Sequence, residues 1–129
     1  MVKNPATILI AEDETTLNQA YQFILKSAGF TVLSAFDGKE ALRIAKQREP
    51  DLILLDLRMP HMDGLHFLRE YNIQQHHPNV RVIVFSNYDI QKDIEAAYQY
   101  GADRYLLKAW ASPQELLRVV KDTLNTPKV

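Results

Sequence analysis

The stretch Asp51-Leu52-Ile53-Leu54-Leu55-Asp56 decides the fold, because it is a continuous apolar run that ends in a carboxylate. Such a run is typical of a strand that is covered on both faces, as in a parallel sheet packed between helices. A loop, residues 57–64, follows Asp56 at once. Open α/β sheets bind their ligands at the carboxyl ends of the strands, so Asp56 lies where such a protein carries its chemistry.

A second apolar run ends in the same way. Residues 8–11 read Ile-Leu-Ile-Ala, and Glu12, Asp13 and Glu14 follow them. Two apolar strands that both end in acids predict one acidic pocket at one edge of a sheet.

Size and composition restrict the class of protein. A chain of 129 residues with 47% apolar and 24% charged residues is one globular domain. A net charge of -1 gives no electrostatic reason to expect direct nucleic-acid binding. Cysteine is absent, which excludes disulfides and thiolate metal sites. No apolar run approaches the roughly 18 residues of a membrane span, and no signal-peptide pattern is present, so we expect a soluble, cytoplasmic protein.

Strand and helix patterns alternate along the chain. Strands are predicted at 7–11, 30–35, 51–56, 80–85 and 104–107. Helices are predicted from about 14 to 28, 37 to 49, 63 to 71, 89 to 100 and 112 to 124. The polar residues 74–78 are expected to form a loop. This alternation predicts an α/β fold, a doubly wound five-stranded parallel sheet with five helices on its two faces.

Two helix starts have the pattern of a capping box. Asp37 is followed by Glu40, and Ser112-Pro113 is followed by Glu115, which we expect to reach back to the cap. We expect one domain over 1–129 with its core at about 6–125, and residues 126–129 as a tail or the start of a linker.

The strand ends together supply one candidate site. The first strand supplies Glu12 and Asp13, and the next three ends supply Asp56, Ser86 and Lys108. Carboxylates about 5 Å apart repel by roughly 3 kcal/mol at an effective dielectric near 20, so three acids need a counter-charge. A hard divalent cation, Mg²⁺, suits oxygen ligands, and Lys108 neutralises what the metal does not.

These residues suit phosphoryl transfer onto a carboxylate. An aspartate acts as a nucleophile and forms an acyl phosphate. The reaction is mostly positioning and charge neutralisation, with a metal, a lysine and a hydroxyl each on one phosphoryl oxygen. Asp56, Lys108 and Ser86 therefore form the candidate catalytic set.

The chain resembles a response-regulator receiver domain of two-component signalling, of the chemotaxis-regulator type, over essentially its whole length. The resemblance rests on the first strand with its acidic pair, 8–14, the phosphoacceptor loop, 56–64, the hydroxyl residue Ser86, and the segment 105–108. It implies a flavodoxin-like sheet of strand order 2-1-3-4-5.

The resemblance also implies a role for each acidic residue. Asp56 would be phosphorylated by a histidine kinase or a phosphotransfer protein. Asp13 and Asp56 would bind Mg²⁺ directly, Glu12 through water, and Arg58 through its backbone carbonyl, which leaves the side chain at 58 free to vary.

The remaining roles concern the phosphoryl group and the readout. Ser86 would bond the phosphoryl group and Lys108 would pair with it, while Tyr105 turns inward. That turn would change the face formed by the fourth helix, the fifth strand and the fifth helix. We expect this face to contact an output domain, a downstream protein or, as a homodimer, a second copy. The protein is then a regulator that assists its own phosphorylation and dephosphorylation, not a conventional enzyme.

One residue departs from the family pattern. Receiver domains usually have a proline after the lysine, joined by a cis bond, whereas Ala109 follows Lys108 here. A non-proline cis bond costs about 2.5–4 kcal/mol, so we predict a trans bond.

Two other functions are compatible with parts of this pattern. The first is a receiver-like interaction module that no longer switches by phosphorylation. The second is an enzyme on the same kind of sheet, either an aspartate-nucleophile phosphatase or a flavin-binding protein. Arg58 stands two residues after Asp56, where the phosphatase needs an aspartate, and no glycine-rich phosphate loop follows the first strand.

Overall fold

The computed structural model describes residues 5–127, which form one five-stranded parallel sheet of order β2-β1-β3-β4-β5. The strands are β1 (Thr7–Ala11), β2 (Thr31–Ala35), β3 (Leu52–Leu55), β4 (Arg81–Ser86) and β5 (Arg104–Leu107). The predicted fold class and strand order are confirmed. Of the predicted tail, 126–129, the last two residues lie outside the described residues.

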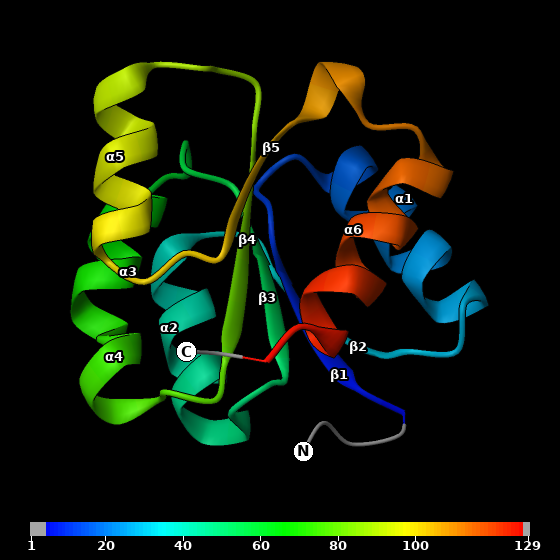
Figure 1. Ribbon diagram of the computed structural model, residues 1–129, viewed down its shortest axis with the longest axis horizontal. Coiled ribbons are helices and arrows are strands. Elements are labelled where there is room, and N and C mark those ends of the chain that lie inside the picture. The colour runs from blue at the N-terminus through cyan, green and yellow to red at the C-terminus, as the bar shows by residue number, and fades with distance from the viewer. Residues whose placement is uncertain (1–4, 128–129) are drawn as a thin grey trace.

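Helices cover both faces of the sheet (Figure 1). The helices are α1 (Thr15–Ser27), α2 (Gly38–Arg48), α3 (Gly64–Tyr71), α4 (Ile73–His76), α5 (Gln91–Gln99) and α6 (Pro113–Asn125), with a short 3-10 turn, η1 (Lys108–Trp110). Helices α1 and α6 pack on one face, and α2 to α5 lie on the other.

Alternation along the strands divides the core into two layers. In β1, Leu9 faces α2 and α3, whereas Ile8 and Ile10 face α1 and α6. The same alternation runs through the two central strands that follow, which is why each reads as a continuous apolar run. All strands point the same way, so their carboxyl ends meet at one edge of the sheet.

Three local predictions differ from the structure. The segment 74–78 was expected to be a loop, but Asn72 adopts a left-handed conformation and the chain then resumes as α4. Helix α5 begins at Gln91 rather than near residue 89, because Ile90 is still extended and supplies no side-chain cap. At α6 the Ser112 hydroxyl accepts from the backbone N–H of Glu115, as predicted, but the Glu115 carboxylate pairs with Arg118 instead of closing the box.

Within residues 5–127, no helix has the length and apolar character that a bilayer span requires.

Candidate functional site

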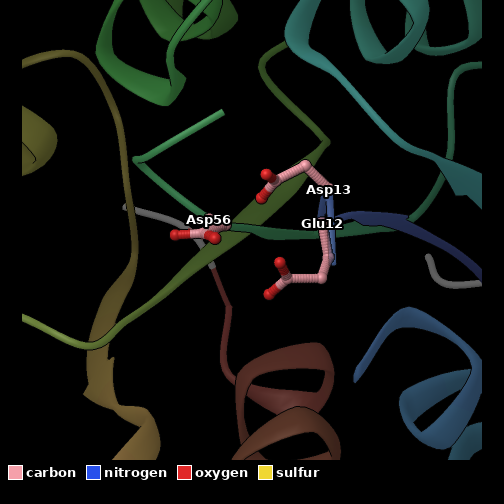
Figure 2. Close-up of side chains that lie close together, drawn as sticks. All are labelled: Glu12, Asp13 and Asp56. Atoms are coloured by element: carbon pink, nitrogen blue, oxygen red, sulfur yellow. The ribbon is translucent and has the colours of Figure 1, made fainter. Parts of the chain in front are cut away.

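The three predicted acids meet at the carboxyl edge of the sheet. Glu12 and Asp13 follow β1, and Asp56 follows β3. The backbone N–H of Asp56 donates to the carbonyl of Ala11 at the end of β1, at 2.9 Å. One carboxylate oxygen from each acid lies within 4.8 Å of the others. Figure 2 shows the three side chains converging on the same space from two strand ends. Glu12 and Asp56 are buried and Asp13 is exposed, so the cluster opens to solvent on one side.

A buried asparagine on α1 fixes the end of the first strand. The Asn18 side-chain amide donates to the carbonyls of Glu12 at 2.9 Å and Ala35 at 3.0 Å. It thereby joins the ends of β1 and β2 beside the acids. Sequence reasoning missed Asn18. The available signal was a polar residue at an inward position of an amphipathic helix, three residues before the buried Tyr21.

Lys108 supplies the internal counter-charge of the cluster. Its Nζ donates to the Glu12 carboxylate and, at 3.2 Å, to Oδ2 of Asp56. All three side chains are less than a tenth exposed, which makes these buried ion pairs. Burial acts to lower the pKa of Lys108, but the hydrogen bond and charge of Glu12 and the charge of Asp56 outweigh it and leave the pKa raised. The structure thus places Lys108 in the site although Ala109 follows it; the trans Lys108–Ala109 bond stays a prediction.

The acid set meets the chemical requirements of a magnesium site. Three carboxylates lie together and the one lysine among them pairs with Glu12 and Asp56 only, so the cluster keeps an excess of negative charge. Burial raises the pKa of Asp13, its backbone hydrogen bond lowers it, and the Glu12 carboxylate raises it further. Hard oxygen ligands with surplus negative charge are what Mg²⁺ prefers. The residues present therefore fit that ion.

Ser86 and Tyr105 lie together on the other side of the site. Ser86 ends β4, is buried, and its Oγ accepts from the backbone N–H of Tyr88 at 3.1 Å. The Tyr105 hydroxyl donates to the carbonyl of the same Tyr88 at 2.8 Å, and its side chain packs against the core layer between the sheet and helices α2 to α5. Burial raises the pKa of Tyr105, while its hydrogen bond with the Ser86 side chain lowers it. The hydroxyl and the predicted readout residue are thus already connected.

The loop after β3 folds tightly over Asp56. The backbone N–H of Arg58 donates to Oδ1 of Asp56 at 3.2 Å, and the N–H of Gly64 donates to Leu57 O at 2.9 Å. A Cβ on Gly64 would stand 2.6 Å from the carbonyl oxygen of Asp56, so only glycine allows this approach. Asp63 then caps α3 by accepting from the N–H of His66 at 2.8 Å. The predicted cap at Asp63 is confirmed.

The Arg58 side chain has partners that sequence reasoning did not find. Its guanidinium lies 3.2 Å from the Asp93 carboxylate on α5 and 5.1 Å from the centre of the Tyr88 ring. No local pattern indicates these contacts, because 35 residues separate Arg58 from Asp93.

The site and its spacing match a known family. The family model described as response regulator receiver domain matches residues 8–121. The chain belongs to this family. Its members are regulatory modules rather than catalytic enzymes, and the Glu12, Asp13 and Asp56 triad of this receiver domain is consistent with its phosphorylation site.

Relatives of this receiver domain include characterised regulators. The nitrate/nitrite response regulator protein NarL of Escherichia coli (strain K12) is 37% identical over 120 residues, 92% of this chain and 54% of that protein. The alkaline phosphatase synthesis transcriptional regulatory protein PhoP of Bacillus subtilis (strain 168) is 31% identical over 122 residues, 95% of this chain and 50% of that protein. The chain thus spans about half the length of the curated relatives it matches.

Solved structures of receiver domains have the same fold. A CheY-like response regulator receiver domain protein from Methanospirillum hungatei JF-1 superposes with a TM-score of 0.86 at 27% identity, over 93% of this chain and 94% of that one. A DNA-binding response regulator of the LuxR family from Staphylococcus aureus superposes with a TM-score of 0.83 at 31% identity, over 93% of this chain and 99% of that one.

Proposed function

We propose that this receiver domain is the phosphoacceptor of a two-component system and that Asp56 accepts the phosphoryl group from a histidine kinase or phosphotransfer protein. The observation that carries the proposal is the position of Asp56, with Glu12 and Asp13 on one side and Lys108 bonded to its Oδ2. A buried carboxylate that shares a lysine with a second acid is oriented before the donor arrives. Preorganised groups of this kind lower the barrier to phosphoryl transfer.

In the reaction, an oxygen of Asp56 attacks the phosphorus of the donor's phosphohistidine. The new P–O bond forms as the P–N bond breaks, and the bonding pair stays with the histidine nitrogen of the donor. Lys108, which bridges Glu12 and Asp56 in the resting protein, pairs with the negative charge that the phosphoryl group brings. The Ser86 hydroxyl donates its own hydrogen to a phosphoryl oxygen while still accepting from Tyr88.

Asp13, Asp56, the backbone carbonyl of Arg58 and, through water, Glu12 would hold Mg²⁺ in this site. An ion held there would supply the neutralisation of phosphoryl charge that one lysine does not provide.

The consequence of phosphorylation lies on the face formed by α5, β5 and α6. Ser86 and Tyr105 meet at Tyr88, in the loop that leads into α5, so a shift of Ser86 toward a phosphoryl group changes the setting of Tyr105. The surface contains exposed aromatic side chains, including Tyr98 on α5 and Trp110 at 78% exposure on η1. We propose that an output domain or a downstream protein binds this face, and that the receiver domain is a regulated part of a signalling pathway.

The direct test is covalent labelling with a small-molecule phosphoryl donor. The protein is incubated with Mg²⁺ and acetyl phosphate, and its intact mass is measured. The wild type should gain one phosphoryl group, and removal of Mg²⁺ with a chelator should prevent the gain. Asp56→Asn should not be labelled, whereas Asp63→Asn, in the same loop, should be labelled as the wild type is, because asparagine also caps a helix.

Labelling of Asp56→Asn to the wild-type extent would refute the proposal. An unlabelled wild type that still binds Mg²⁺ would favour the interaction module that no longer switches.

A further inference from the structure

The loop between β4 and α5 brings three parts of the receiver together at one residue, Tyr88. Its N–H donates to Ser86 Oγ, its carbonyl accepts from the Tyr105 hydroxyl, and its ring lies under the Arg58 guanidinium. The first two contacts use only its backbone. The third depends on an arginine in the phosphoacceptor loop, whose side chain the metal-binding role leaves free to vary.

The Arg58 guanidinium makes two contacts across the same gap. It lies over the Tyr88 ring, with its central carbon 5.1 Å from the ring centre, and pairs with Asp93 in the first turn of α5 at 3.2 Å. A planar guanidinium is suited to both contacts at once, because it stacks on aromatic faces and donates from its edge. A lysine keeps the charge but cannot stack in the same way. The arrangement depends on the residue types that this chain has at three separate positions, namely Arg58, Tyr88 and Asp93.

The chemistry of the Ser86 hydroxyl gives this contact a consequence. A hydroxyl accepts with its lone pairs and donates its single hydrogen. The Tyr88 N–H occupies a lone pair of Ser86 Oγ, so the hydroxyl hydrogen points to an acceptor, which is the neighbouring Tyr105 hydroxyl in the resting protein and would be a phosphoryl oxygen after phosphorylation. A contact that holds Tyr88 in place therefore also fixes the direction in which the Ser86 hydroxyl donates its hydrogen. It also fixes the Tyr88 carbonyl, which accepts from the Tyr105 hydroxyl.

We propose that Arg58 is a positioning residue for phosphoryl binding: its side chain clasps the β4–α5 loop through Tyr88 and Asp93 and thereby orients the Ser86 hydroxyl and the Tyr105 ring. The effect on phosphoryl binding rests on the function proposed above, but the clasp itself does not. Since the Arg58 side chain is more than half exposed, the clasp is weak and its removal should change equilibria only two- to fivefold, roughly.

The test uses Arg58→Ala, Arg58→Lys and a matched control, Arg43→Ala, which removes an exposed arginine from α2. First, amide hydrogen exchange over residues 87–99 is measured in the metal-free protein. Arg58→Ala should exchange about two- to fivefold faster there than the wild type, with Arg58→Lys between them and Arg43→Ala unchanged. Exchange in Arg58→Ala equal to that in Arg43→Ala would overturn the clasp.

Second, the affinity for beryllium fluoride with Mg²⁺, an acyl-phosphate mimic, is measured in the same proteins. Arg58→Ala should bind it about two- to fivefold more weakly than the wild type. In a Tyr88→Leu background Arg58→Ala should have a smaller effect, because the aromatic ring that faces the guanidinium is gone. Unchanged or tighter binding by Arg58→Ala would overturn the positioning role. If the wild type itself fails to bind the mimic, the proposed function fails, and the exchange measurement still decides the clasp.

Discussion

The two edges of the sheet use the same residue type in opposite ways. At the amino edge, where the strands begin, two acids hydrogen-bond to the backbone of a neighbouring strand. Asp51 accepts from the N–H of Thr7 at 2.7 Å, and Asp103 accepts from the N–H of Val82 at 2.8 Å. At the carboxyl edge, Glu12, Asp13 and Asp56 lie close together, and Lys108 pairs with Glu12 and Asp56. An acid that pairs with a strand N–H stabilises the fold, whereas a cluster of acids with one cation keeps charge for a ligand.

The comparison is tested most strongly at Asp56. Asp56→Asn should abolish phosphoryl labelling, since the amide is a poor nucleophile. It should also raise the free energy of unfolding of the metal-free protein by about 1 kcal/mol, because it removes one of the clustered charges. Labelling assays and urea denaturation measure the two effects. A variant that keeps its labelling but loses stability would mean that Asp56 is a structural acid like Asp51.

The second largest effect is expected at the shared cation. Lys108→Met leaves Glu12 and Asp56 buried without a cation, and breaking such a pair costs about 3 kcal/mol. Mg²⁺ should restore much of this loss, because it binds only the folded cluster and replaces the missing charge. Denaturation with and without Mg²⁺ checks both statements, with Lys92→Met, at an exposed lysine of α5, as the control. A deficit that Mg²⁺ leaves unchanged would contradict the account.

Sequence reasoning predicted the carboxyl edge better than the amino edge for a physical reason. Acids at the ends of apolar runs are a local signal, and parallel strands bring such ends together whatever the packing details. By contrast, His77 lies in a polar stretch that predicted only a surface loop. In the structure its ring stacks on buried Tyr71 at 3.9 Å and its Nδ1 lies 2.9 Å from Glu49 Oε2.

The other contacts that were missed are also long-range. Arg58 meets Asp93 and Tyr88 only after β3 and β4 are placed side by side. The left-handed conformation of Asn72, which separates α3 from α4, depends on one backbone setting that no periodicity predicts. The fold and the acidic centre of the site follow from strand ends, whereas the contacts that tune the site follow from the packing.

A smaller effect is expected from a structural acid. Asp51→Ala removes the acceptor of the Thr7 N–H at the start of β1 and should lower the free energy of unfolding by about 1–2 kcal/mol. It should leave Mg²⁺ affinity and phosphoryl labelling at wild-type values, because the change lies at the far edge of the sheet. Isothermal titration and denaturation curves test this pair of statements, and a loss of Mg²⁺ affinity in the folded variant would break the division between the edges.

The smallest effect concerns pH near the amino edge. Burial, and then the charge of Glu49, raise the pKa of Tyr71 well above its usual value, and its hydroxyl donates to Ala45 O at 3.1 Å. Because the folded-state pKa is the higher one, the contribution of neutral Tyr71 to the unfolding free energy is complete below the ordinary tyrosine pKa, near 10. It is lost as the pH rises above that value, by about 1 kcal/mol per pH unit. The difference in unfolding free energy between the wild type and Tyr71→Phe should therefore decrease as the pH is raised from about 9 to about 11. A constant difference would show that Tyr71 ionises equally in both states.

The central claim is that the acids of the carboxyl edge form one magnesium-dependent phosphoryl site, while those of the amino edge build the sheet. Fluorine NMR of the protein with Mg²⁺ and beryllium fluoride tests it most directly, with Asp56→Asn and Asp51→Ala measured beside the wild type. We predict resonances of bound fluoride in the wild type and in Asp51→Ala, and none in Asp56→Asn or without Mg²⁺. Bound fluoride in Asp56→Asn, or its absence from folded Asp51→Ala, would contradict the account.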